Sequence, residues 1–216
     1  PYYLSILEYL EALTGPYADG IYNIERTMDM LNQLSNELNI DSFFLAGNSM
    51  GGYISWNFAI NYPEKVKRLI LIDSAGYSFE MPMMLKLLDT PVLKDSMAFI
   101  TPKFVVTQTL SEVYGDGSKV TDETIERYHQ LMLREGNRQA VVSVLKTLTN
   151  VNTDDIKQVK APTLVQWGEK DAWIPLAHAQ QFADEIEGAK LITYPGVGHI
   201  PMEEIADKTA QDAKKF

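Results

Sequence analysis

One glycine-flanked serine constrains the fold of this chain more than any other feature. Ser49 lies in the segment 47–51 (GNSMG), which follows the apolar run 43–46 and precedes the helix-like segment 53–59. A serine in this context sits on a very tight strand-to-helix turn, and the glycines two before and two after it remove side chains that would collide. The turn is expected to lift the hydroxyl out of the sheet and to aim the backbone N–H of Met50 at the same space, where the helix N-terminus favours negative charge.

Two further polar residues follow predicted strands in the C-terminal part of the chain. Residues 162–168 read as a buried strand that Asp171 follows, and residues 190–194 read as a strand that His199 follows. The chain order serine, aspartate, histidine predicts that the three side chains meet at the carboxyl edge of one sheet. There His199 is expected to take the proton of the Ser49 hydroxyl, while Asp171 holds the imidazole tautomer.

Other titratable residues offer alternatives. Asp73 follows another predicted strand and is the alternative acid, although the strand-Gly-x-x-Asp spacing favours Asp171. His129 and His178 fall in helix-like segments and are expected at the surface. The aspartate pair 154–155 is expected in a solvated loop or a helix cap, because the sequence has no histidine and carboxylate cluster with metal-ligand spacing. We therefore predict no metal site.

Predicted helices alternate with fully apolar strands. A helix is expected after Asn23, a plausible N-cap, and it ends before the strand that leads to the serine. Its apolar face comprises Ile24, Met28, Leu31, Leu34 and Leu38. Continuously apolar strands that alternate with helices predict a mostly parallel sheet covered on both faces, which is an α/β fold.

The segment 77–157 breaks this alternation. It contains no convincing buried strand and several helix-like pieces, for one of which Thr121 and Asp122 provide the start. The pieces are 84–88, 104–114, 122–135 and 139–149. We therefore divide the chain into a first α/β part (1–76), a helical insertion (77–157) and a second α/β part (158–216).

Composition narrows the class of protein. The 216 residues are 45% hydrophobic and 22% charged, which suits one compact domain with a real core. The net charge of -10 argues against nucleic acid or an anionic membrane as a partner. The chain contains no cysteine, and no apolar run approaches the roughly 20 residues of a membrane span. With no leader-like N-terminus either, a cytoplasmic location is the expectation.

The chain resembles the α/β-hydrolase family, in its lipase, esterase and C–C hydrolase-like branch. The resemblance lies in four segments: 47–52 at the turn, 168–175 around the acid, 198–204 around the histidine, and 71–76, which is similar to the end of the family's sixth strand. It covers the chain from about residue 13 onward. The resemblance implies an α/β-hydrolase fold in which the insertion after the sixth strand is a helical cap over the serine.

The same resemblance implies the roles of several residues. Ser49 is the expected nucleophile, His199 the base, Asp171 the acid, and the Met50 N–H one oxyanion donor. The expected substrate pocket includes Asn48, Trp173, Ile174 and Ile200. No cofactor or metal is implied.

The N-terminus departs from the family pattern. Full-length members have earlier strands and a loop, often beginning His-Gly, that donates a second oxyanion N–H, whereas residues 2–7 are expected to be what remains of the family's fourth strand. We therefore expect an N-terminally truncated fold with weakened activity, since one missing donor costs about 10²–10³ in turnover. An open sheet edge near the N-terminus makes a homodimer a further expectation.

These observations favour hydrolysis of a carboxylic ester through an acyl-enzyme, with a small ester or related acyl compound as the substrate. C–C bond hydrolases that cleave diketone products share the same triad and are the alternative enzymes, with thioesterases and perhydrolases also open. A non-catalytic ligand-binding relative, or a fragment that only binds, is the alternative of another class.

Overall fold

The computed structural model describes residues 24–78, 102–134, 137, 153 and 155–216. The predictions for residues 2–7, 84–88 and 139–149 therefore lie outside the described residues, as do Asn23 and Asp154. The undescribed ranges are 1–23, 79–101, 135–136, 138–152 and 154.

The described elements alternate as the apolar pattern predicts. The strands are β1 (Phe43–Asn48), β2 (Val66–Ile72), β3 (Thr163–Gly168) and β4 (Lys190–Tyr194). The helices of the sheet layers are α2 (Ile24–Glu37), α3 (Met50–Asn61), α9 (Ala177–Glu185), α10 (Pro201–Glu204) and α11 (Ala206–Lys215). The insertion contributes α6 (Lys103–Val113) and α7 (Asp122–Leu133), and the short 3-10 turns η1 and η2 cover Gly117–Lys119 and Ile156–Gln158.

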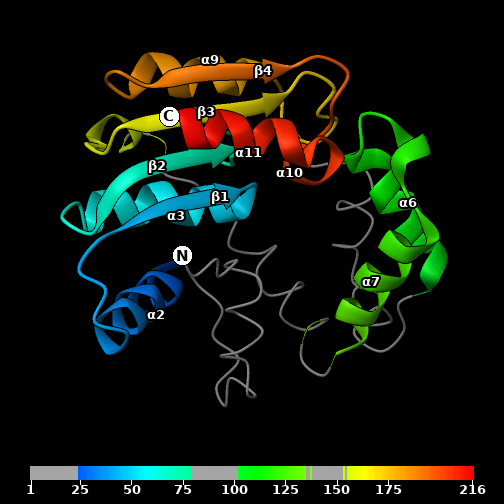
Figure 1. Ribbon diagram of the computed structural model, residues 1–216, viewed down its shortest axis with the longest axis horizontal. Coiled ribbons are helices and arrows are strands. Elements are labelled where there is room, and N and C mark those ends of the chain that lie inside the picture. The colour runs from blue at the N-terminus through cyan, green and yellow to red at the C-terminus, as the bar shows by residue number, and fades with distance from the viewer. Residues whose placement is uncertain (1–23, 79–101, 135–136, 138–152, 154) are drawn as a thin grey trace.

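The four strands form one parallel sheet in the order β1-β2-β3-β4. Helices α3 and α9 lie behind the sheet in Figure 1, and α11 lies in front of it. The Gln166 amide of β3 donates to the Thr209 carbonyl of α11 (3.1 Å), which fixes that helix on its face. The predicted α/β architecture, a parallel sheet with helices on both faces, is confirmed.

Large buried aromatic side chains fill the space between the sheet and α3 and α9. Trp56, Phe58, Trp167 and Phe182 are fully buried, and the Trp56 indole N–H donates to the Ala75 carbonyl at 3.1 Å. Each such side chain contributes roughly 1.5–3 kcal/mol by its burial. Because α3 is buried on nearly all sides, it carries apolar residues around its whole circumference instead of on one stripe.

Helices α6 and α7 form a separate apolar cluster beside the carboxyl ends of the strands (Figure 1). The Thr121 hydroxyl accepts the Thr124 N–H at 3.1 Å, so the helix start expected there is confirmed. Ile200, which comes directly after His199 in the chain, packs into the same cluster. The insertion and the C-terminal part of the chain are therefore joined at the sheet edge where the active-site residues were expected.

Two sequence expectations are wrong. Leu38 does not extend the apolar face of α2, because that helix ends at Glu37, Asn39 adopts a φ of 53°, and Leu38 is 51% exposed. His178 is buried instead of lying at the surface, and its ring contacts the edge of Tyr77 with 5.3 Å between centroids. Burial lowers the pKa of His178. Among the described residues no helix is both long enough and apolar enough to cross a bilayer.

Candidate active site

Ser49 occupies a strained turn between β1 and α3. Its φ is 55° and its ψ is -121°, a conformation that costs a non-glycine residue on the order of 1–3 kcal/mol. The Ser49 N–H donates to the Ile72 carbonyl (3.0 Å), and the Ser49 carbonyl accepts the Ala75 N–H (2.9 Å). These bonds to the chain around the end of β2 hold the strained backbone, and the serine itself stays partly exposed.

The glycines around Ser49 have different roles. A Cβ on Gly47 would lie 2.2 Å from the Gly51 carbonyl oxygen, and a Cβ on Gly52 would lie 2.2 Å from the Ser74 hydroxyl. Gly51, by contrast, has open space around its Cβ position, so the expectation that it prevents a collision is wrong. The turn requires Gly47 on the strand side and Gly52 on the helix side.

His199 and Asp171 form a buried pair. Their Nδ1 and Oδ2 atoms are 2.7 Å apart, and their side chains are 3% and 0% exposed. The other carboxylate oxygen of Asp171 accepts the N–H groups of Trp173 (2.7 Å) and Ile174 (3.0 Å), which fixes the carboxylate in place. Because a carboxylate only accepts hydrogen bonds, Nδ1 of His199 carries the proton and Nε2 is left as the acceptor.

The Nε2 atom of His199 is buried and has no hydrogen-bond partner among the described residues. Buried polar atoms without a partner are rare and frequently belong to functional sites. The Ser49 hydroxyl therefore does not donate a hydrogen bond to this nitrogen in this structure. The Trp173 ring lies against the imidazole, with 5.3 Å between centroids.

Asn48 connects the serine turn to the histidine loop. Its amide nitrogen donates to the His199 carbonyl at 2.9 Å and to the Ile72 carbonyl at 3.1 Å. The residue next to Ser49 is thus bonded to the backbone of His199, although the two are about 150 positions apart in the chain. Asn48, expected in the substrate pocket, links the serine turn to the histidine loop in this structure.

The other expected pocket residues lie on different sides of the site. Ile174 is buried in the main core with the sheet, and Ile200 is buried in the cluster of α6 and α7. Trp173 is partly buried and contacts both clusters. The Met50 N–H is at the first position of α3, where helix N–H groups have no partner within the helix, which suits an oxyanion donor.

Asp73 adds a second carboxyl group beside the His199–Asp171 pair. One of its oxygens accepts the Gly168 N–H at 2.9 Å, and the other has no hydrogen-bond partner among the described residues. Burial, with the negative charge of Asp171 as the next cause, raises the pKa of Asp73 well above its usual value. The imidazole bonds Asp171, so Asp171 rather than Asp73 fits the role of the acid.

Asp73, Asp171 and His199 could together be taken for metal ligands, since one ligand atom from each lies within 4.8 Å of the others. Two features make a metal a poor fit. The Asp73 carboxyl favours its neutral form, and Nδ1 of His199 is already bonded to Asp171. The group therefore fits a proton-transfer site better than a metal centre.

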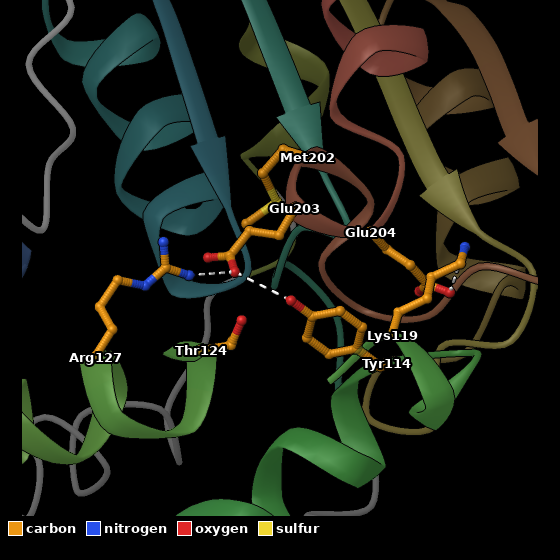
Figure 2. A pocket seen from close by; sticks show the side chains of 7 residues that line it. All are labelled: Tyr114, Lys119, Thr124, Arg127, Met202, Glu203 and Glu204. Atoms are coloured by element: carbon orange, nitrogen blue, oxygen red, sulfur yellow. Dashed lines mark hydrogen bonds and ion pairs between the residues drawn. The ribbon is translucent and has the colours of Figure 1, made fainter. Parts of the chain in front are cut away.

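Residues of α10 contribute contacts that the sequence reasoning did not assign. Glu203 and Glu204 stand within the histidine motif, and their carboxylates bond residues of the insertion across an open pocket of about 620 Å³ (Figure 2). The signal was a pair of acidic residues four and five positions after the histidine. Their partners in the insertion could not be found from the sequence because they lie 75 or more positions away.

Comparisons with known proteins agree on one fold family. A family model described as alpha/beta hydrolase fold matches residues 15–205. Lipase 1 of Psychrobacter immobilis is 30% identical over 201 residues, covering 90% of this chain and 62% of the lipase. The 2-hydroxymuconate semialdehyde hydrolase of Pseudomonas putida is 28% identical, covering 92% of this chain and 70% of that enzyme. This chain thus spans less than two thirds of the length of the lipase.

Solved structures share the same architecture. A meta-cleavage product hydrolase from Pseudomonas fluorescens IP01 superposes with a TM-score of 0.78 at 21% identity, covering 93% of this chain and 72% of that one. A thermophilic esterase from Thermogutta terrifontis superposes with a TM-score of 0.75 at 24% identity, covering 90% and 72%. At these identities the superpositions establish the fold alone.

Proposed function

Because the chain belongs to the α/β-hydrolase fold family, we propose that it is a serine hydrolase that cleaves carboxylic esters through an acyl-enzyme intermediate. One observation carries the proposal: a buried 2.7 Å bond joins Asp171 to His199 Nδ1, while Nε2 has no hydrogen-bond partner among the described residues and belongs to a loop bonded to the strained serine turn. An imidazole so oriented acts as a general base toward a nearby hydroxyl.

The reaction follows from these atoms. His199 Nε2 takes the proton of the Ser49 hydroxyl as Oγ attacks the ester carbonyl carbon, and the Met50 N–H stabilises the negative oxygen of the tetrahedral intermediate. His199 then gives the proton to the leaving alkoxide, and the alcohol departs. A water that His199 deprotonates attacks the acyl-enzyme, and His199 returns that proton to Ser49 Oγ as the carboxylic acid is released. Asp171 stabilises the imidazolium at each stage.

The C–C bond hydrolases are the second candidate. Two kinds of relative, a lipase and a semialdehyde hydrolase, match this chain at nearly equal identity. The same serine, histidine and acid could attack the ketone carbonyl of a diketone and release a carbon leaving group. Only a direct comparison of substrates separates the two reactions.

A fluorophosphonate probe tests the nucleophile. We expect labelling of Ser49 in the wild-type protein and none in Ser49→Ala or His199→Ala, because only a serine beside a base is nucleophilic enough to react. Ser111→Ala is the matched control, since Ser111 is an exposed helix serine whose hydroxyl only bonds the Thr107 carbonyl. Wild-type protein that stays unlabelled would instead favour a ligand-binding relative without catalysis.

A substrate comparison then tests the reaction class. We expect short-chain p-nitrophenyl esters to be hydrolysed faster than a diketone dienoate of the meta-cleavage type. The expected turnover is about 10²–10³ below that of an enzyme with two oxyanion donors, if the Met50 N–H acts alone. Faster turnover of the diketone would contradict the ester proposal and favour the C–C reaction.

A further inference from the structure

The end of α6 and the loop of His199 touch backbone to backbone. The His199 N–H donates to the Val113 carbonyl at 2.7 Å. A Cβ on Gly198 would lie 2.3 Å from that carbonyl oxygen, and a Cβ on Gly115 would lie 2.5 Å from the Gly198 nitrogen. Two glycines are therefore needed where the insertion meets the catalytic loop, and a small movement of one backbone must move the other.

The carboxylate of Glu204 bridges this contact. One oxygen accepts both the Gly115 N–H (3.0 Å) of the insertion and the Gly198 N–H (2.9 Å) of the histidine loop. The other oxygen accepts the Asp116 N–H at 3.0 Å and lies 3.4 Å from the Lys119 ammonium group. The side chain of Glu204 is 0% exposed, so the carboxylate depends on these four donors in place of water.

The neighbouring Glu203 makes a different kind of contact. Its carboxylate bonds side chains of the insertion: Arg127 at 2.8 Å and the Tyr114 hydroxyl at 3.2 Å, both drawn in Figure 2, and the Tyr128 hydroxyl at 2.5 Å. Burial, together with the Glu203 charge, raises the pKa of Tyr114 to about 12. Among the described residues, no hydrogen bond of the Glu203 carboxylate reaches the histidine loop, so this side chain anchors the insertion to α10 without contacting that loop.

We infer that Glu204 is a positioning residue that fixes the His199 ring relative to Ser49 by joining the histidine loop to the insertion. The inference rests on the proposed function. Glu204 bonds the residue immediately before His199, while the His199 N–H itself is bonded to the insertion. Since misplacing a catalytic group by about 1 Å can cost about 10²-fold in rate, loss of the bridge is expected to slow catalysis without removing a reacting group.

Substitutions of the two glutamates separate positioning from simple anchoring. Glu204→Leu removes all four bonds, and we expect kcat to fall about 10²-fold with little change in KM. Glu204→Gln keeps one carbonyl oxygen, which can still accept from Gly115 and Gly198, so we expect a partial rescue to within about tenfold of wild type. Glu203→Gln is the matched control and should change kcat less than about threefold, since it alters a partly exposed ion pair.

A measurement at His199 shows whether the loop moves. The proton between His199 Nδ1 and Asp171 should give a low-field NMR signal in the wild type and in Glu203→Gln. We expect the signal to shift or broaden in Glu204→Gln, and the Gly115 and Gly198 amides to exchange faster with solvent. If Glu204→Leu does not fold, Glu204→Gln alone decides: an unchanged signal together with unchanged kcat overturns the inference, and a shifted signal with lowered kcat supports it.

Failure of the inference is distinguishable from failure of the proposed function. If the wild type neither hydrolyses esters nor reacts with a fluorophosphonate, the proposed function fails. The NMR signal and the amide exchange then still test whether Glu204 joins the histidine loop to the insertion. If the wild type is active and both Glu204 variants keep its kcat, the proposed function stands and the positioning role is refuted. An equal loss of kcat in Glu203→Gln and Glu204→Gln also refutes it, because anchoring alone would then explain the effect.

Discussion

Replacing Asp73 with asparagine should make the protein more stable at neutral pH than the wild type. Asp73 is 0% exposed, and its pKa is raised well above the usual value by burial and then by the charge of Asp171. The asparagine side chain has the same shape, is always neutral, and keeps an oxygen that can accept the Gly168 N–H. The variant therefore removes the cost of a buried carboxyl without opening a cavity.

The expected size follows from proton linkage. In the unfolded chain Asp73 ionises near pH 3.9, whereas the folded state holds the proton to higher pH. Where the folded state binds one more proton, its stability falls by about 1.4 kcal/mol for each pH unit. As the pH rises above about 4, the wild type should thus lose stability relative to Asp73→Asn, until the pH passes the raised pKa of Asp73 in the folded state.

Urea unfolding at several pH values measures this difference. The buried Trp56 and Trp167 report unfolding by fluorescence. The wild type and the variant share every other titrating group, so the difference between their free energies of unfolding reports Asp73 together with its coupling to Asp171. Asp41→Asn, at an exposed position, controls for the loss of one negative charge. Parallel curves for the wild type and Asp73→Asn would refute the reasoning, because Asp73 would then titrate alike in both states.

The same variant tests which carboxylate serves as the acid. Asp171 bonds the imidazole and Asp73 does not, so we expect Asp73→Asn to keep hydrolysis within about tenfold and Asp171→Asn to lose about 10⁴-fold. The initial rate on a short-chain ester is the measurement. The opposite order of losses would make Asp73 the acid.

Three further comparisons of variants have defined outcomes. Ser49→Gly should be more stable than Ser49→Ala by on the order of 1–3 kcal/mol in urea unfolding, because glycine tolerates the φ of 55°; equal midpoints would show that the turn relaxes. Gly168→Ala should destabilise by about 1–3 kcal/mol, since its Cβ would lie 2.0 Å from the Gly198 carbonyl oxygen, whereas Gly117→Ala has open space and should be neutral. The wild type should lose stability as pH falls below about 6.5, because burial lowers the pKa of His178 in the folded state and the unfolded chain therefore takes up the proton first. His178→Gln should lose less stability over the same range. Equal losses in the wild type and the variant would contradict this.

Some sequence expectations succeeded because they rest on local rules. The strands β1 to β4, the start of α7 at Thr121 and the loops that carry Ser49, Asp171 and His199 follow from apolar runs and turn residues. The pairing of Asp171 with His199 was reached from chain order, and the 2.7 Å bond agrees with it. The expectations about the homodimer and the location of the protein in the cell stay predictions.

Other expectations failed where long-range packing overrides local pattern. A polar histidine in an amphipathic segment suggests the surface, yet His178 is buried because α9 turns it toward Tyr77 and the sheet. Gly51 looked as necessary as Gly47, but only the approach of Ser74 and Ser55 to the turn shows which glycines lack room for a Cβ. Neither contact has any signature in a window of neighbouring residues.

The sequence by itself predicted the order of strands and helices along the chain and the loops that carry Ser49, Asp171 and His199, because periodicity and turn chemistry act over a few neighbouring residues. Only the tertiary structure decided which carboxylate bonds the histidine, that Asn48 links the serine turn to the histidine loop, and that Glu204 joins the insertion to that loop. These depend on atoms brought together from distant parts of the chain, and their strength comes from burial, which no local pattern encodes.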